Sequence, residues 1–185
     1  MGVRMRLVEA YDIERLAKIQ ALYQEAFPAS ERKPFKLMIK KREEGVMELQ
    51  ALENEQNEFC GLAITILYQD MVLLDYFAIA PKMRGKGTGT EAFSLLRDKY
   101  AQKRFFLEIE RTDVEAENLL QRQKRKNFYL RNGLTETAMY VRLFGVEMEV
   151  LSDSCKVNFE EYKRLYADTF GENYINRHVI LISEG

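Results

Sequence analysis

The chain has 185 residues, 46% of them hydrophobic and 31% charged, and its formal net charge at pH 7 is −1. This length and composition are typical of one globular α/β domain, and the balanced charge excludes a general electrostatic attraction to nucleic acid or to a membrane surface. No apolar run approaches the ~18 residues of a membrane-spanning helix, and the first residues lack the basic and then apolar pattern of a signal peptide. We therefore expect a cytoplasmic protein that binds neither nucleic acid nor membrane.

The chain carries few of the residues that build metal sites or nucleophilic triads. Its two cysteines, Cys60 and Cys155, lie far apart and show no C-x-x-C spacing, and His178 is the only histidine. One histidine excludes multi-histidine metal sites and argues against a Ser-His-Asp triad. We predict no metal site and no disulfide framework, and we interpret His178 as structural.

In chain order, the apolar periodicities of the first half predict a strand, two helices and an antiparallel meander of three strands. Asp12 is placed to cap the first helix, Gly45 follows the second helix as a C-terminal cap, and Pro81 ends the meander. The predicted segments are a strand at 3–8, helices at 12–25 and 34–44, and strands at 46–52, 59–67 and 71–80.

The second half of the chain predicts alternating helices and strands, followed by a closing helix. This helix ends at Gly171 and carries an apolar stripe, which either covers the domain's own sheet or forms a dimer contact. The predicted segments are a helix at 90–103, a strand at 105–110, a helix at 114–131, strands at 134–144 and 146–151, a helix at 158–170 and an edge strand at 174–183.

The most informative segment is the glycine-rich loop R84-G-K-G-T-G89, which follows a buried strand and opens a helix. Glycines let backbone N–H groups approach a ligand closely, and the start of a helix adds unpaired donors and partial positive charge. Arg84 and Lys86 supply cations at the same place. The loop therefore predicts a pyrophosphate-binding site.

Two other phosphate-binding loops have glycine patterns that could apply to this segment. The P-loop pattern G-x-x-x-x-G-K-[ST] is absent. The dinucleotide pattern G-x-G-x-x-G/A is met by Gly87, Gly89 and Ala92, with Glu108 or Glu110 about 20 residues further on. A Rossmann-type NAD(P)-binding oxidoreductase is thus an alternative, although Pro81–Lys86 separates the strand from the first glycine and an antiparallel meander precedes it.

The segment resembles the GNAT N-acetyltransferase family, whose central motif is [RQ]-x-x-G-x-[GA]. Arg84, Gly87 and Gly89 match this motif, and the apolar strand and Pro81 stand at the family's spacing before it. A second match is F128-Y129-L-R-N-G133-L134, in which Tyr129 stands four residues before Gly133 as in the family. The resemblance covers about residues 3–151, and the order of predicted elements agrees with it.

The resemblance implies a mixed α/β fold, with a central, mostly antiparallel mixed sheet that is splayed around acyl-CoA and flanked by helices. It implies a single acetyltransferase domain over residues 1–185, in which 152–185 is a C-terminal extension with one helix. The implied reaction moves an acetyl group from acetyl-CoA, as co-substrate, to a small-molecule or peptide amine by direct attack. A non-catalytic acyl-CoA-binding module is a further alternative, and family members are often homodimers.

The resemblance also assigns roles to individual residues. Tyr129 would donate a proton to the departing thiolate. Arg122 and Arg125 stand where many members have Asn and Ala, so either Asn118 or the basic run 122–126 would meet the cofactor. The implied cofactor contacts are the backbone of Phe77, Ala78 and Ile79 for the pantetheine arm, and Arg84, Gly85, Lys86, Gly87, Thr88 and Gly89 for the pyrophosphate.

An amine acceptor must lose a proton before it attacks, because an alkylammonium group has a pKa near ~10. Glu108 and Glu110 share parity on the predicted strand at 105–110, so we expect both carboxylates on one side as candidate bases. Asp75 is a third candidate. Glu31 and Arg32 lie between the first two helices, in the region that usually shapes the acceptor pocket of the family.

Overall fold

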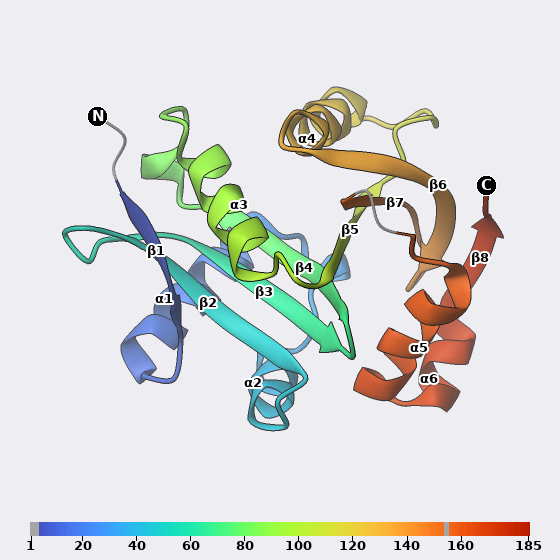
Figure 1. Cartoon of the computed structure of the whole chain (residues 1–185), viewed down its shortest axis with the longest axis horizontal. Coiled ribbons are helices and arrows are strands. Elements are labelled where there is room, and N and C mark those ends of the chain that lie inside the picture. The colour runs from blue at the N-terminus through green and yellow to red at the C-terminus, as the bar shows by residue number, and fades with distance from the viewer. Residues whose placement is uncertain (1–3, 154–155) are drawn as a thin grey trace. The chain divides into compact units, whose positions relative to one another are not determined.

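The computed structural model describes residues 4–153 and 156–185 of the chain (Figure 1). Val3 of the predicted first strand and Cys155 lie outside these described residues. The chain divides into an N-terminal unit, within residues 1–67 and 74–101, and a C-terminal unit, within residues 68–73 and 102–185. A single domain over residues 1–185 stays a prediction.

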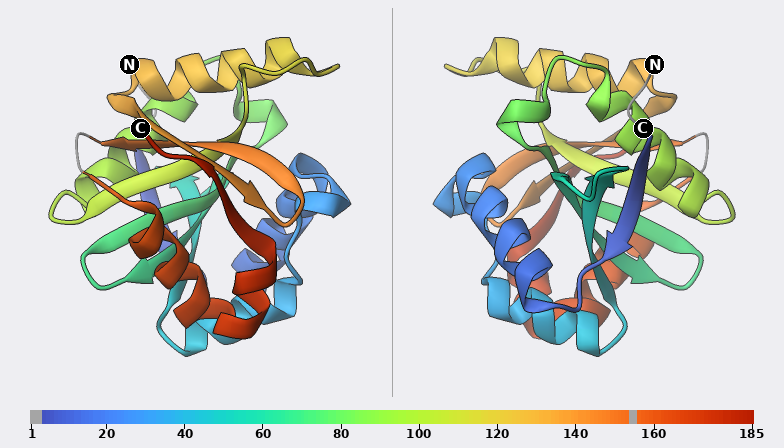
Figure 2. Two further views of the ribbon diagram at one scale, coloured as in Figure 1. Left: turned by 90° about the vertical axis from the view of Figure 1, so that its right-hand side faces the viewer. Right: turned by 90° about the vertical axis from the view of Figure 1, so that its left-hand side faces the viewer.

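The N-terminal unit is built on strands in the spatial order β1-β2-β3-β4, and β2 pairs antiparallel with both β1 and β3. Helices α1 and α2 lie on one face of these strands and α3 lies on the other (Figures 1 and 2). The bounds are β1 Met5–Glu9, α1 Ile13–Ala26, the 3-10 turn η1 Ala29–Glu31, α2 Phe35–Glu43, β2 Met47–Asn54, β3 Phe59–Tyr68, β4 Met71–Ile79, the 3-10 turn η2 Pro81–Met83 and α3 Thr88–Lys99.

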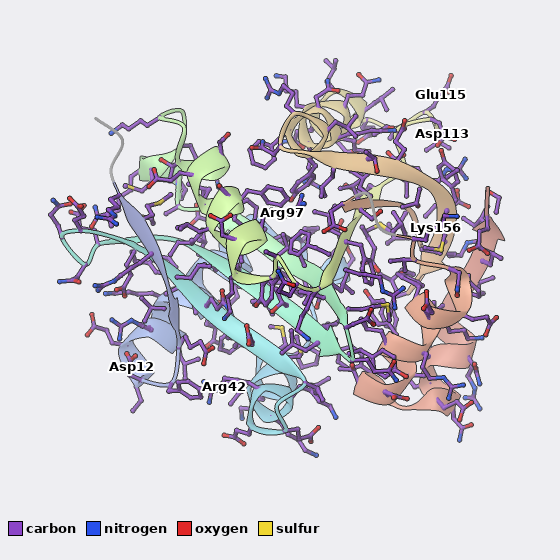
Figure 3. The ribbon with its side chains drawn as sticks, in the orientation of Figure 1. Asp12, Arg42, Arg97, Asp113, Glu115 and Lys156 are labelled. Carbon is purple, nitrogen blue, oxygen red and sulfur yellow. The ribbon has the colours of Figure 1, made fainter. Side chains whose placement is uncertain are left out.

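The predicted helix signals of this unit are confirmed. Asp12 lies at the start of α1 (Figure 3), where its Oδ1 accepts a hydrogen bond from the Arg15 N–H at 2.9 Å. Gly45 follows α2 with a φ of +76°, a left-handed conformation that glycine adopts without steric cost. Large apolar side chains of α1, α2 and the strands fill the core: Ile19, Tyr23, Met38, Leu49 and Leu62 are all almost fully buried.

The C-terminal unit contains strands in the order β5-β7-β6-β8, and each adjacent pair among them is antiparallel. Helix α4 lies on one face of these strands, and α5 and α6 lie on the other (Figures 1 and 2). The bounds are β5 Arg104–Glu110, α4 Leu119–Arg131, β6 Leu134–Leu143, β7 Val146–Asp153, α5 Phe159–Phe170, α6 Glu172–His178 and β8 Val179–Ser183.

The apolar stripe of α5 covers the strands of its own unit. Tyr162, Leu165 and Tyr166 are fully buried, and the ring of Tyr162 packs on that of Phe106 in β5. The Asn158 side chain and the Glu161 side chain form a capping box at the start of this helix. The prediction that α5 packs on its own sheet is therefore confirmed, and the alternative of a dimer contact through this stripe is wrong.

Three predicted boundaries are wrong. The segment 174–183 is not one strand, because Gly171, with a φ of +100°, breaks α5 and starts α6, so the extension holds two helices before β8. Helix α4 begins at Leu119 rather than at 114, because Arg111 Nε and Nη2 bind the Asp113 carboxylate at 2.8 and 2.7 Å and hold a non-helical turn (Asp113 in Figure 3). Helix α3 ends at Lys99 rather than at 103.

Among the described residues, no group of acidic, cysteine or histidine side chains could hold a metal ion. None of the helices that the structure describes is long and apolar enough to cross a membrane. Cys60 carries a buried free thiol, and burial raises its pKa. The ring of His178 packs against Phe144 and Tyr174, as expected for a structural residue.

Arg104, at the start of β5, clamps the turn before β4 to the first turn of α5. Its Nε and Nη2 bind the Asp70 carboxylate at 2.8 and 2.9 Å, and its Nη1 binds Glu161 Oε2 at 2.9 Å. Hydrogen bonds from this guanidinium lower the pKa of both Asp70 and Glu161.

We expect the protein to lose stability in acid through this clamp. The pKa of each carboxyl is lower in the folded chain than its ordinary value of 3.8 or 4.5, so the stabilisation is present above those values and is lost as the pH falls through the folded values. Urea titrations from about pH 7 to pH 3 should show a falling midpoint that Arg104→Gln partly flattens. Arg164→Gln, at an exposed arginine of α5, should leave the wild-type pH dependence intact.

Gly61 in β3 lets the end of β4 approach closely. A Cβ at this position would lie 2.4 Å from the carbonyl oxygen of Ala78 and 3.2 Å from the Cα of Ile79. Next to it, the Ala80 N–H donates to the Cys60 carbonyl at 2.8 Å. Glycine is therefore required for the pairing that places the end of β4.

We predict that Gly61→Ala lowers the free energy of unfolding by about 1–3 kcal/mol, because the contacted atoms are backbone and cannot rotate away. Chemical denaturation measures this loss, and amide exchange should show faster opening at Ala80. A variant as stable as the wild type, with unchanged exchange, would contradict the close approach.

Candidate functional site

The glycine-rich loop connects β4 to α3 within the N-terminal unit. After Ile79 the chain makes the 3-10 turn η2, then passes through Arg84–Gly87 and enters α3 at Thr88. Gly85 and Gly87 have φ values of +78° and +77°, and nothing lies within 4 Å of the position that a Cβ would take on either of them. The loop backbone is thus left-handed at both glycines and open on its outer side.

Two side-chain hydrogen bonds hold the loop to β4 and to η2. Arg84 Nε donates to the Ile79 carbonyl at 2.9 Å, and the Thr88 hydroxyl donates to the Met83 carbonyl at 2.7 Å. Arg84 and Lys86 are exposed, whereas Thr88 is buried. Thr88 and the Nε of Arg84 therefore shape the loop, and the remaining guanidinium nitrogens and Lys86 provide its positive charge.

The start of α3 offers backbone donors at this loop. The N-cap residue is Gly87, which has no side chain to bond the N–H groups of the first turn. Glu91 is the acid of that turn, and its Oε1 accepts a hydrogen bond from the Met5 N–H at 2.8 Å. The free N–H groups and the helix dipole suit a phosphate group, so the loop has the geometry expected from its sequence.

The predicted pantetheine contacts lie on the last residues of β4. Ala78 is buried, and the ring of Phe77 packs on Phe93 of α3. The Ile79 carbonyl already accepts the Arg84 hydrogen bond, so it has less capacity for a ligand. The pantetheine contacts of Phe77, Ala78 and Ile79 stay a prediction of the resemblance.

Tyr129 lies near the end of α4 in the C-terminal unit. Its side chain is 8% exposed, and its ring meets that of Phe128 edge-on at 5.2 Å between centroids. Burial raises the pKa of Tyr129 to about 12, against an opposing effect of Arg125. The hydroxyl is therefore protonated at neutral pH.

Glu108 of β5 is held by two tyrosines of α5. The Tyr162 hydroxyl donates to Glu108 Oε1 at 2.5 Å, and the Tyr166 hydroxyl donates to the same oxygen at 2.8 Å. Sequence reasoning treated both tyrosines only as members of an apolar stripe. Their spacing of four residues, which puts two hydroxyls on one helix face, is the signal that could have indicated a polar partner.

Glu110 does not share the surroundings of Glu108. Its carboxylate pairs with Arg122 at 2.7 Å and with Arg125 at 3.6 Å, and both arginines belong to α4. The expectation of one common side for the two acids is therefore wrong. Glu110 is the last residue of β5, and the long arginine side chains of α4 reach its carboxylate there.

The basic run of α4 is largely engaged inside the C-terminal unit. Arg122 Nε also donates to Asn118 Oδ1 at 2.7 Å, and Lys126 pairs with Glu149 at 2.9 Å and with Glu136. Lys124 is exposed. Arg122 and Lys126 of this run therefore have acidic partners within the C-terminal unit.

The connection between α1 and α2 is anchored on β4. Lys33 Nζ binds both carboxylate oxygens of Asp75, at 2.8 and 2.9 Å, and the Tyr76 hydroxyl donates to the Glu31 carbonyl at 2.7 Å. The Tyr23 hydroxyl of α1 donates to the Lys33 carbonyl at 3.0 Å. Asp75 is thus an anchor for this connection, and its carboxylate is neutralised by Lys33.

A surface cavity of about 410 Å³ opens beside this connection. We call it the α1–α2 cavity. Sequence reasoning singled out Arg32 here but missed the contributions of the helices on either side. The lining residues are Gln20, Tyr23, Gln24, Ala29, Arg32, Lys33, Pro34, Phe35 and Lys36.

Comparison with known proteins addresses the expected family. A search of curated protein sequences returns no match. Among solved structures, the chain is similar to a protein from Bacteroides thetaiotaomicron assigned to the GNAT family, with 19% identity, a TM-score of 0.74, and coverage of 91% of this chain and 99% of that one.

Two structures of a spermidine N-acetyltransferase from Vibrio cholerae are also similar. One is a complex with CoA and spermine, at 15% identity and a TM-score of 0.63, covering 82% of this chain and 95% of that one. The other is a dodecamer in an intermediate state, at 15% identity and a TM-score of 0.63, covering 82% and 94%. At these identities the likeness shows the fold, which confirms the expected mixed α/β GNAT architecture.

The antiparallel pairing of β2 with its neighbours, before the loop, excludes the Rossmann-type alternative, whose sheet is parallel. The model of the acetyltransferase (GNAT) family matches residues 13–124, which is more than half of the 185 residues. The chain belongs to the acetyltransferase (GNAT) family.

Proposed function

We propose that the protein is an N-acetyltransferase that moves an acetyl group from acetyl-CoA directly to an amine. The observation that carries this proposal is the loop Arg84–Gly89, whose two left-handed glycines open the N-terminus of α3 in a chain of this family. CoA carries a pyrophosphate, and that is the group which such a loop is built to bind. The amine acceptor and a homodimer remain expectations of the sequence.

In the proposed reaction the neutral amine nitrogen attacks the thioester carbonyl carbon. A C–N bond forms, the C–S bond breaks, and the thiolate leaves with the electron pair of that bond. One proton must leave the amine and one must reach the thiolate, so the reaction needs a base and a donor. A backbone N–H near Phe77 or Ala78 would stabilise the oxyanion.

Tyr129 is the proposed donor to the thiolate. Burial raises the pKa of Tyr129 to about 12, whereas a thiol has a pKa near ~8.5, so complete proton transfer from this hydroxyl is uphill. The hydroxyl therefore acts mainly as a hydrogen-bond donor that stabilises the developing negative charge on sulfur.

Glu108 is the preferred base of the two predicted carboxylates. Glu110 is already engaged in ion pairs with two arginines of α4, at 2.7 and 3.6 Å. The Tyr162 and Tyr166 hydroxyls hold the carboxylate of Glu108 in one orientation. Proton transfer from the ammonium would be direct or through a water molecule.

We predict that Gly87→Ala weakens binding of CoA and acetyl-CoA by about tenfold or more. A side chain at a φ of +77° costs about 1–2 kcal/mol, and the loop would relax away from the conformation that points its N–H groups outward. Calorimetric titration measures the affinity. Gly45→Ala is the matched control, because its φ of +76° and its open surroundings impose the same strain away from the loop. Equal affinity of Gly87→Ala and the wild type would contradict the proposed site.

We predict that Tyr129→Phe lowers kcat for thiol release by about 10²-fold while leaving the affinity for acetyl-CoA unchanged. The control is Tyr140→Phe, which removes a hydroxyl from β6 of the same unit. Unchanged kcat in Tyr129→Phe would remove this residue from the mechanism. If the wild type binds CoA tightly but releases no thiol with any amine of a broad panel, the non-catalytic acyl-CoA-binding module is the correct description.

A further inference from the structure

All the charged side chains that line the α1–α2 cavity are positive. Of its nine lining residues, three are cationic, namely Arg32, Lys33 and Lys36, and none is acidic. Its volume of about 410 Å³ is in the range of small-molecule sites. The ring of Phe35 and the buried ring of Tyr23 give it an apolar side, and the amides of Gln20 and Gln24 give it a polar one.

Two of the three cations are available to a ligand. The Lys33 ammonium is neutralised by Asp75 at 2.8 Å. By contrast, no acidic side chain among the described residues pairs with Arg32 or Lys36. Arg32 makes one long hydrogen bond, from Nη1 to the Gln24 carbonyl at 3.5 Å, which leaves most of its donors unused.

The cavity is held in shape before any ligand arrives. Tyr76 of β4 accepts the Lys33 N–H at 3.2 Å and donates to the Glu31 carbonyl at 2.7 Å, so it fixes the backbone on both sides of Arg32. The ring of Tyr76 also meets that of Tyr23 edge-on at 4.8 Å. A preformed site loses less entropy on binding than a mobile one does.

The first turn of α2 adds to the same positive potential. This nine-residue helix follows Pro34, has no side-chain cap and has no acidic residue in its first turn. Pro34, Phe35 and Lys36, which begin the helix, all line the cavity. The partial positive charge of the helix start therefore acts in the same direction as Arg32 and Lys36.

We propose that the α1–α2 cavity binds the anionic group, a carboxylate or a phosphate, of the amine that the enzyme acetylates. This inference rests on the proposed acetyl transfer and specifies its substrate class. The acceptor would be an amine that also carries an anion on a small apolar or aromatic body, which the Tyr23 and Phe35 side would accommodate. Polyamines would be poor acceptors, because their only charges repel Arg32 and Lys36.

The test compares amines that differ only in the anionic group. Tyrosine is paired with tyramine for the carboxylate, phosphoethanolamine is paired with ethanolamine for the phosphate, and spermidine represents polyamines. We expect kcat/KM for thiol release from acetyl-CoA to be about tenfold or more higher for the anionic member of at least one pair, as one charge-assisted contact provides.

The variant Arg32→Gln/Lys36→Gln should abolish this preference by raising KM for the anionic amine, and it should not lower kcat/KM for the partner amine that lacks the anionic group. Lys40→Gln is the matched control, since Lys40 lies one turn further along α2 and does not line the cavity. It should keep the wild-type preference. A preference for tyramine, ethanolamine or spermidine over the anionic amines would overturn the proposal. So would a preference for anionic amines that survives in the double variant.

Calorimetric titration separates the cavity from the chemistry. If no amine is acetylated but tyrosine or phosphoethanolamine binds the wild type and not the double variant, the anion site stands and the proposed acetyl transfer fails. If acetyl-CoA is consumed while no anionic amine is preferred or bound, the acetyl transfer stands and the anion site is wrong. Absence of both binding and turnover would overturn the site as well.

Discussion

The buried ion pair between Lys33 and Asp75 is the contact that anchors the α1–α2 connection, and with it the α1–α2 cavity, on β4. The two side chains are only 14% and 4% exposed, so each charge has lost most of its water and needs the other. A pair of this kind adds little net stability, but removing one partner leaves a buried charge. Its effect is therefore on position: it fixes the α1–α2 connection on β4, and β4 continues directly into the glycine-rich loop.

The geometry of the glycine-rich loop depends on backbone groups, and this explains why the sequence predicted that geometry. A left-handed backbone at Gly85 and Gly87 strongly favours glycine, and the N–H donors of α3 exist in any helix. Glycine spacing therefore reports the geometry directly. The same holds for Asp12 and Gly45, whose roles at helix ends follow from local rules.

Features that depend on contacts between distant elements were not predictable. The tyrosine pair on Glu108 joins residues 54 and 58 positions apart, and no local pattern encodes that pairing. The α1–α2 cavity combines two helices and their connection, so only the structure shows which side chains line it. The alternation of side chains along β5 did not predict the partners of Glu110, because this residue is the last of the strand and an arginine of α4 reaches it.

The C-terminal extension contributes to the candidate chemistry although the family match ends at residue 124. Helix α5 lies beyond that limit, yet its Tyr162 and Tyr166 hydroxyls bind the carboxylate of Glu108, with charge-assisted hydrogen bonds of the stronger kind. The buried ring of Tyr162 also packs on Phe106 of the same strand. The extension is thus part of the surroundings of the preferred base.

The fold and the acceptor are specified by different residues. A fold shared at 15% identity with a spermidine N-acetyltransferase carries no information about the acceptor of the proposed reaction, because function depends on the site. Two unit charges at 4 Å interact by about 1 kcal/mol in water and about 4 kcal/mol near a protein surface. The charges of Arg32 and Lys36, rather than the shared fold, therefore determine which acceptor is favoured. Acidic residues at these two positions of the same helices would attract the polycation that this cavity repels.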